Sequence, residues 1–311
     1  KRSRTEGPHK NADVLNINIK EFLEKSPKFK NNYKGYKVSV EFKEKKMMIN
    51  PYFLGLWLGD GSSAKVSIYT QDKEVIIFLN EYAKQLDLEV REYIALNKCP
   101  EYSITNKKQV DGKIAFSLQK LLRDENLLDN KHIPNNYLIN SEKNRLELLA
   151  GLIDSDGHYD IKANGYEITQ KDENLATQIK YLCDSLGFRT SLIKKKASIK
   201  KINFETEVYR VRFFGDIDKI PVKIERKKAK PWTCNRTWNQ TGIKIEKDMV
   251  DEYFGFEIDG NKLFLLEDMT VTHNTALVLN MALKNVERGK GVIFFSLEMP
   301  AEQLMLRMLA A

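Results

Sequence analysis

Two nine-residue segments repeat one pattern, and this repeat restricts the fold more than any other feature of the chain. Phe53–Gly61 reads FLGLWLGDG, and Leu149–Gly157 reads LAGLIDSDG. Each is an apolar stretch that ends in Asp-Gly, which predicts a buried helix with the glycine as its left-handed C-cap. Small residues would let the two helices approach backbone to backbone: Gly55, Gly59, Ala150 and Gly151. The repeat therefore predicts a central pair of helices.

An aspartate ends each segment, at a position where a negative charge is unfavourable. Asp60 and Asp156 would face the negative end of a helix dipole, which typically costs about 0.3 to 1 kcal/mol. If the helices pack side by side, the two carboxylates project from the same end, and divalent cations between them would offset their repulsion. A single Asp-Gly is most often only a turn. Its duplication favours a metal site.

The two segments resemble the paired motifs of LAGLIDADG homing endonucleases, and Leu149–Gly157 matches eight of the nine letters of that motif. The resemblance covers roughly residues 51–230. It implies an α+β fold of two pseudo-symmetric αββαββα halves, about 51–145 and 146–230, with the motif helices at the centre. It also implies that Asp60 and Asp156 are catalytic acids that bind Mg²⁺. The implied protein is a monomer that cuts both strands of double-stranded DNA at a long, asymmetric site.

The family also uses a basic residue in each half, near the scissile phosphate. Lys131 lies 71 residues after Asp60, and Lys227 lies 71 residues after Asp156. The equal spacing favours these two lysines, and Lys131 also has the better local match to the family. Lys223 and Lys228 remain alternatives in the second half.

Alternating residues between each motif and its lysine predict strands with one polar face and one core face. The polar residues of this alternation are Lys65, Ser67, Tyr69, Arg210 and Arg212. A twisted β-ribbon with such a face fits the major groove of DNA and can read base edges. We therefore expect these five side chains to contact DNA.

Basic residues are unevenly distributed along the chain. The net charge is +8, and residues 1–50 alone hold 13 Lys and Arg against 6 Asp and Glu. Two further basic clusters lie within residues 194–201 and 223–230. Clustered cations indicate a polyanion as partner, because neutralising phosphates releases condensed counterions. We expect Lys194 and Lys195 to bind DNA, although a solvated basic surface is the alternative interpretation.

The stretch before residue 275 has a different chemistry. It ends in His273 and Asn274, and Thr275 follows. An Asn side-chain amide can attack its own backbone carbonyl and break the chain if a neighbour such as His273 assists the leaving nitrogen. The hydroxyl of the next residue, Thr275, can accept an acyl group as an ester. Residues 254–274 are similar to the C-terminal splicing blocks of inteins, so residues 231–274 are expected to be the β-rich C-terminal part of a Hint splicing domain.

The other half of a splicing domain is not found upstream of residue 51. Splicing also needs an N-terminal Cys or Ser nucleophile and a Thr/Asn-x-x-His block, and neither is present there. Residues 1–50 instead resemble a basic connecting region between a splicing domain and an endonuclease. We expect the sequence to be a fragment of a longer helicase precursor, and this fragment lacks the N-terminal splicing half of the intein. Such a chain can at most cleave after Asn274 and should not splice alone.

Residues 275–311 form a short α/β pattern too small for a core of its own. They resemble the segment that follows the P-loop in hexameric, RecA-like replicative DNA helicases, which makes them the start of a helicase C-extein. The resemblance implies that Thr275 binds Mg²⁺ in the spliced P-loop and that Glu298 polarises water for ATP hydrolysis. ATP and this Mg²⁺ would bind only in the spliced helicase.

Composition excludes a membrane protein, because no apolar run approaches the roughly 18 residues that a spanning helix needs. Cys99, Cys183 and Cys234 are isolated, which indicates a reducing compartment, the cytoplasm of a prokaryotic cell or an organelle stroma. Two functions remain open. One is an intein-encoded homing endonuclease, and the other is a degenerate intein that binds DNA without cutting, its parent acting mainly as an ATP-dependent helicase after splicing. A transcription regulator or RNA maturase is disfavoured by the splice junction.

Overall fold

The computed structural model describes residues 15, 17, 19–107, 117–199, 204–231, 238–246 and 263–273 of the 311-residue chain. These residues fall into two compact units. The larger unit is Ser39–Asn239, and the smaller unit combines Lys1–Val38 with Gln240–Ala311. The finer domain boundaries drawn from the sequence remain predictions.

A pair of buried helices, α3 (Pro51–Asp60) and α7 (Glu142–Asp156), forms the centre of the larger unit. Each begins where the sequence offers an N-cap, because the side chains of Asn50 and Ser141 accept backbone N–H groups of the first turn. The helices touch backbone to backbone. A Cβ atom on Gly55 would lie 2.2 Å from the Leu148 carbonyl oxygen, and Gly151 has the reciprocal relation to Tyr52. The predicted central helix pair is confirmed.

The expected left-handed C-caps are wrong. Gly61 has φ −79° and ψ 154°, and Gly157 has φ −80° and ψ 146°, so both helices end in extended backbone. Glycine is needed there for space. A Cβ atom on Gly61 would lie 2.3 Å from the Trp57 carbonyl oxygen, and one on Gly157 would lie 2.5 Å from the Ile153 Cα. The backbone is extended at each glycine, so the aspartate is the last residue of each helix.

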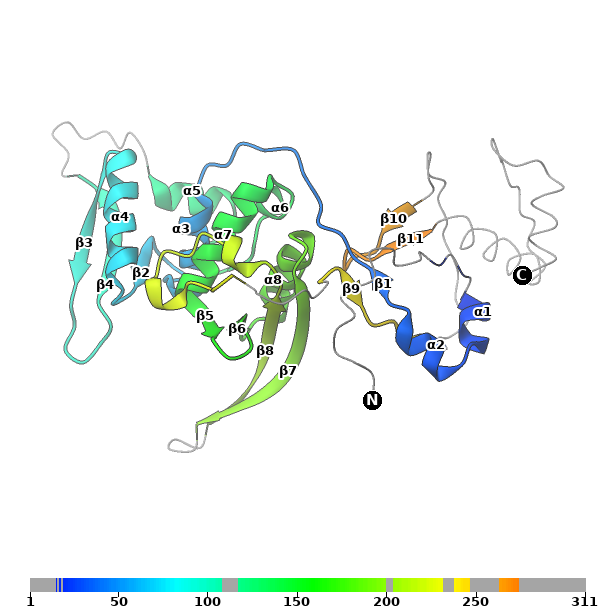
Figure 1. Cartoon of the computed structure of the whole chain (residues 1–311). Helices are drawn as coiled ribbons and strands as arrows, with labels where there is room; N and C mark the ends of the chain where they lie inside the picture. The colour runs from blue at the N-terminus through cyan, green and yellow to red at the C-terminus, as the bar shows by residue number, and fades with distance from the viewer. Residues whose placement is uncertain are drawn as a thin grey trace, which may run out of the picture. The chain divides into compact units, whose positions relative to one another are not determined.

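The first repeat continues from α3 through alternating strands and helices. Its elements are β2 (Ser67–Tyr69), α4 (Lys73–Gln85), β3 (Leu88–Tyr93), β4 (Glu101–Asn106), α5 (Leu118–Asp124) and α6 (Asn135–Leu138). The strands form an antiparallel sheet in the order β2-β4-β3, and an isolated bridge joins Gly61 to Ile68. Figure 1 shows α4 lying along this sheet.

The second repeat has a similar order of elements, with one additional strand and with 3-10 turns in place of the last two helices. It comprises α7, β5 (Gly157–Asp160), β6 (Gly165–Gln170), α8 (Glu173–Ser185), β7 (Arg189–Ile199) and β8 (Phe204–Phe214), followed by the 3-10 turns η2 (Ile217–Lys219) and η3 (Glu225–Lys227). Its sheet has the order β5-β6-β8-β7, and β7 and β8 form the long curved ribbon of Figure 1. Leaving β5 aside, the order β6-β8-β7 matches β2-β4-β3, so the two repeats share a topology.

A buried arginine fastens the segment before α3 to the second repeat. The Arg145 guanidinium is fully buried and donates to the Asn140 carbonyl, the Ser185 hydroxyl and the Val40 carbonyl. It also lies 4.9 Å from the centre of the Phe42 ring. Removing it would leave several buried acceptors unpaired, which makes it a structural element of the larger unit.

The smaller unit contains short elements. Helices α1 (Ile19–Glu24) and α2 (Pro27–Asn32) precede β1 (Gly35–Tyr36), which pairs with β9 (Gln240–Thr241). Strands β10 (Leu263–Leu265) and β11 (Val271–His273) form a hairpin. Residues 247–262 of the expected splicing segment and the helicase-like residues 275–311 lie outside the described residues. The described part of the chain is thus an α+β protein, as expected, and none of its helices is long and apolar enough to span a membrane.

The helix contact makes a testable prediction about stability. Gly55→Ala should lower the free energy of unfolding by at least about 2 kcal/mol, because its Cβ meets rigid backbone. At Gly59 a Cβ atom would meet the Ser155 side chain instead, at 2.1 Å from Oγ. The variant Gly59→Ala should therefore regain stability when Ser155→Gly is added. Urea unfolding followed by circular dichroism measures both, and a Gly55→Ala protein as stable as wild type would contradict the close packing.

Candidate active site at the paired helix ends

Two carboxylates end the central helices close to each other. Asp60 ends α3 and Asp156 ends α7, and the Asp156 Oδ2 atom lies 3.2 Å from the position of a Cβ on Gly59. Burial and then the Asp156 charge raise the pKa of Asp60 to about 6, although Lys227 and Lys131 act in the opposite direction. Two like charges held in partly dry surroundings are what a cation between them would stabilise.

A glutamine fixes one of these carboxylates. Gln170, at the end of β6, donates its side-chain N–H to the Asp156 Oδ2 at 2.7 Å. Asp156 keeps part of its surface exposed to solvent, yet the surrounding protein raises the pKa of its carboxyl, with the Gln170 hydrogen bond acting against that shift. Sequence reasoning missed Gln170, because its distance from the motif along the chain carries no signal.

Each of the two lysines singled out by spacing lies at the end of one central helix. Lys131 Nζ donates to the carbonyl oxygens of Gly59 at 3.1 Å and Gly61 at 2.8 Å. Lys227 Nζ donates to the carbonyl oxygens at the end of α7, on Ile153, Asp154 and Ser155, at 2.8 to 2.9 Å. An ammonium group at a helix C-terminus satisfies unpaired carbonyls and offsets the dipole. Burial lowers the pKa of both lysines.

The alternatives to Lys227 lie elsewhere. The Lys223 ammonium lies over the rings of Tyr52 and Phe78, 4.9 and 5.4 Å from their centres. Lys228 is exposed and pairs with Glu225 at 2.6 Å. Lys227 is therefore the member of this trio whose ammonium reaches the end of α7.

Asp154, inside the second motif, was not singled out from the sequence. Its buried carboxylate accepts the Tyr52 hydroxyl at 2.6 Å and the backbone N–H groups of Lys223 and Ile224 at 2.8 and 3.3 Å. Asp154 thus joins α3, α7 and the segment that carries Lys227. The first motif has Leu58 at the matching position. This difference between the two motif copies is the signal by which Asp154 could have been singled out from the sequence.

The polar face of the first sheet is partly neutralised by one acid. Lys65 Nζ lies 2.5 Å from Glu101 Oε1, and the Tyr69 hydroxyl donates to Glu101 Oε2 at 3.3 Å. Lys65 and Tyr69 are exposed, whereas Ser67 is 1% exposed. The Ser67 side chain is thus covered by the packed sheet, and its contact with DNA stays a prediction.

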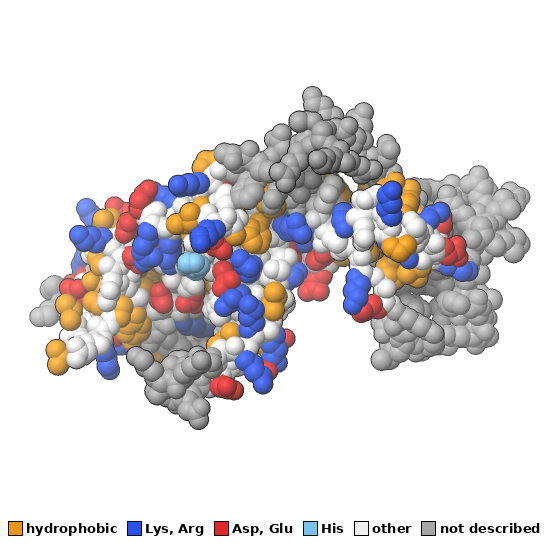
Figure 2. All heavy atoms as spheres, turned by 60° about the horizontal axis from the view of Figure 1, so that its bottom comes forward, with side chains coloured by type: hydrophobic (Ala, Val, Ile, Leu, Met, Phe, Trp, Pro, Cys, Tyr) orange, Lys and Arg blue, Asp and Glu red, His pale blue; other side chains and the backbone are white. Residues whose placement is uncertain are grey.

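The second sheet repeats this arrangement with arginines. Glu167 pairs with Arg210 at 2.9 Å and with Arg212 at 3.3 Å, and Asp160 lies 3.5 Å from Arg212. Figure 2 shows Lys and Arg side chains interspersed with Asp and Glu on the face it draws. Anionic ligands would have to compete with these carboxylates for the arginines, which makes binding sensitive to salt.

Lys194 and Lys195 point to opposite faces of the β7–β8 ribbon. Lys195 is opposite Val208 in the register, on the same face as Arg210 and Arg212. Lys194 is opposite Tyr209 on the other face and pairs with Glu207 at 2.8 Å. The two lysines therefore lie on opposite faces, because neighbouring residues of a strand face opposite ways, and their contacts with DNA stay predictions.

The predicted splicing residues lie at the edge of the described chain. His273 ends β11, where its backbone pairs with Leu263. Asn274, Thr275 and Glu298 lie outside the described residues.

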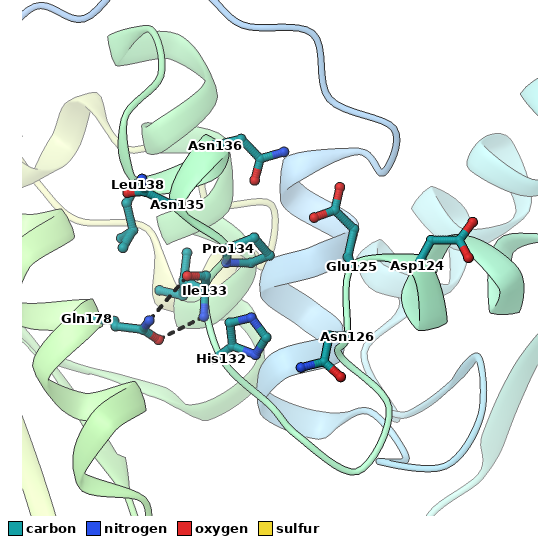
Figure 3. Close-up of a pocket in the computed structure, with 10 residues that line it drawn as sticks. All are labelled: Asp124, Glu125, Asn126, His132, Ile133, Pro134, Asn135, Asn136, Leu138 and Gln178. Carbon is teal, nitrogen blue, oxygen red and sulfur yellow. Dashed lines mark hydrogen bonds between the residues drawn. The ribbon is translucent and has the colours of Figure 1, made fainter.

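The carboxylate pair suits a hard cation but cannot complete its shell. Within the described residues no group of three or more His, Cys, Asp or Glu side chains is placed to hold a metal ion. Mg²⁺ prefers six oxygen ligands and keeps several waters. Asp60 and Asp156 fit as two such ligands, with water and phosphate oxygens left to supply the rest. The residues that line an open hollow of about 530 Å³, drawn in Figure 3, include Glu125, His132 and Gln178. Neither Asp60 nor Asp156 lines it.

The raised pKa of Asp60 predicts a pH-dependent stability. Between pH 4 and 6 the folded protein binds a proton at Asp60 that the unfolded chain, with a pKa of 3.8, releases, so ionised Asp60 destabilises the fold above about pH 6. Asp60→Asn should stabilise the protein by about 1 kcal/mol at pH 7.5 after allowance for solvent screening. The gain should vanish near pH 4 in urea unfolding.

Asp218 supplies the matched control, because it is an exposed carboxylate outside this site. Asp218→Asn should change stability little at either pH. If Asp60→Asn is no more stable than wild type at pH 7.5, burial and the Asp156 charge do not disfavour ionised Asp60 as described.

Part of the chain matches a known protein family. Residues 143–218 match the family model described as LAGLIDADG-like domain. The replicative DNA helicase DnaB of Mycobacterium intracellulare is 28% identical over 282 residues, which cover 88% of this chain and 43% of that protein. The chain therefore spans less than half the length of this relative.

Solved structures with some similarity include those of the homing endonuclease I-DmoI. Its mesophilic variants are 16% identical, with a TM-score of 0.35, over 53% of this chain and 87% of that chain. The complex of I-DmoI with DNA and Mn is 15% identical, with a TM-score of 0.36, over 53% of this chain and 88% of that chain.

Proposed function

We propose that this chain, whose residues 143–218 match a LAGLIDADG-like domain, is an intein-encoded homing endonuclease that makes metal-dependent double-strand cuts in DNA. Its larger unit would comprise the two pseudo-symmetric halves of that family. The observation that carries the proposal is the pairing at the helix ends, where two acids and two lysines meet in matching positions. Each repeat would serve one DNA strand.

The chemistry of the site follows from its charges. Asp60 and Asp156 would hold Mg²⁺, which when bound would polarise the phosphate and lower the pKa of an attacking water. The Lys131 and Lys227 ammonium groups, whose pKa values are lowered by burial, would offset negative charge that develops on the phosphate oxygens. Gln170 would keep the Asp156 carboxylate oriented.

The DNA would lie along the polar faces of the two sheets. Lys65, Tyr69, Arg210, Arg212 and Lys195 are placed on those faces. Their carboxylate partners Glu101 and Glu167 would discourage binding to random DNA, because each ion pair must be exchanged for a phosphate or base contact. The two faces differ in sequence, which supports a long, asymmetric target bound by one copy of the chain.

The surrounding sequence supports an intein within a replicative helicase precursor. The relationship to a DnaB helicase supports this placement. In this proposal His273 assists cyclisation of Asn274, and Thr275 receives the acyl group during splicing. After splicing, Thr275 and Glu298 would serve Mg²⁺ and ATP in a hexameric helicase.

The decisive test is cleavage. The purified chain with Mg²⁺ should cut a duplex that encodes the uninterrupted helicase sequence into two fragments, and Asp156→Asn should lower the rate at least about 100-fold with unchanged DNA affinity. Gel electrophoresis of the products and a mobility-shift assay measure the two effects. Asp218→Asn is the control and should cut as wild type does.

A duplex that is retarded by wild type but never cut would reject the endonuclease and support a degenerate intein that only binds DNA. A duplex neither bound nor cut would reject both. Mg²⁺ removal by a chelator should abolish cutting and leave binding in place.

The splice-junction chemistry makes its own prediction. Slow scission after Asn274 should release a peptide with the mass of residues 275–311, and Asn274→Ala should prevent it, because alanine has no amide to cyclise. Mass spectrometry after long incubation detects the product. Equal amounts of this peptide from both proteins would assign the break to a contaminating protease.

A further inference from the structure

The two lysines are carried by short segments at the end of each repeat, and each segment contacts the opposite repeat. We name residues 130–134 the first lysine segment and residues 223–228 the second lysine segment. Lys131 and Lys227 reach their helix ends only if these segments stay in place, because each ammonium must meet its carbonyls at 2.8 to 3.1 Å.

One glutamine of the second repeat holds the first lysine segment. Gln178, on α8, accepts the Ile133 N–H at 2.8 Å and donates to the Ile133 carbonyl at 3.2 Å. Figure 3 shows its amide facing this peptide, with both bonds drawn. Ile133 is buried, so these backbone groups cannot turn to water instead. We call these two hydrogen bonds the Gln178 clamp, and the residue that it holds, Ile133, is two positions from Lys131.

The first repeat holds the second lysine segment in return. Arg226 donates to both carboxylate oxygens of Asp72, at 2.8 and 2.7 Å, and Asp72 precedes α4. The Glu225 N–H donates to Glu74 Oε1 at 3.2 Å. A charge-assisted pair to both oxygens restricts the direction of the segment as well as its distance. We call these contacts the Arg226 clamp, and Arg226 is the residue directly before Lys227.

We propose that Gln178 and Arg226 are reciprocal positioning residues. Gln178 of the second repeat positions Lys131 of the first repeat. Arg226, held by Asp72 of the first repeat, positions Lys227 of the second. The proposal rests on the proposed endonuclease function for its catalytic consequence. α8 packs against the β5-β6-β8-β7 sheet and α4 against the β2-β4-β3 sheet, so each clamp begins on a helix that supports one polar face. Loosening one clamp should therefore impair one strand cut more than the other.

The first measurement needs no cleavage. In Gln178→Ala, amide hydrogen exchange at Ile133 should become about tenfold faster, while Glu225 keeps its rate. In Arg226→Ala, Glu225 should exchange faster and Ile133 should not. Thr177→Ala, an exposed neighbour on α8, and Lys219→Gln, which breaks the Lys219–Glu142 pair within one repeat, are the matched controls and should change neither rate.

The second measurement follows each strand separately on an end-labelled duplex. The ratio of the two strand-cutting rates should shift about tenfold in Gln178→Ala and in the opposite direction in Arg226→Ala, because a misplaced lysine affects one phosphate. Gln178→Glu keeps the acceptor for Ile133 and should regain part of the ratio. General destabilisation would slow both cuts together.

Opposite shifts of the ratio, with exchange changes confined to the matching segment, support the proposal. Unchanged exchange at Ile133 and Glu225, or a ratio that stays constant or moves the same way in both variants, overturns it. If wild type cuts neither strand, the proposed function fails, and the exchange rates still decide whether the clamps hold the two segments.

Discussion

The contact between the backbones of α3 and α7 is the constraint on which the rest of the larger unit depends. Gly55 and Gly151 face each other at a distance that leaves no room for a single carbon atom. This approach brings two helix ends together, and with them two carboxylates and the carbonyls that the lysines bind. It also explains why Tyr52 of one helix can bond Asp154 of the other.

The charges at this junction compensate each other without cancelling. A helix C-terminus repels a carboxylate, and the ammonium groups of Lys131 and Lys227 reduce that repulsion by bonding the terminal carbonyls. The same burial that raises the pKa of Asp60 lowers the pKa of the lysines, so neither kind of group is fully satisfied in its ionised form. A site held in this state is suited to a ligand that brings both phosphate and metal.

The helix pair was predictable, because a duplicated motif is a linear signal, and the equal spacing singled out Lys131 and Lys227. The α+β class followed from the resemblance. The linear sequence carries no signal where the answer depends on pairing in space. A run of adjacent lysines has no visible alternation, so only the register of β7 against β8 separates Lys194 from Lys195. Gln170 and Gln178 are ordinary residues until folding brings them to Asp156 and Ile133.

The β7–β8 ribbon is longer than the matching β3–β4 ribbon of the first repeat. Each of its strands has 11 residues, against 6 in β3 and β4. At about 3.3 Å per residue the longer ribbon measures roughly 36 Å, close to one turn of B-form DNA, and the shorter about 20 Å. In the proposed complex, the β7–β8 ribbon would cover about one turn of the DNA on its side of the two carboxylates. The β3–β4 ribbon would cover little more than half a turn on the other side. The protected stretch would therefore be off-centre from the cut.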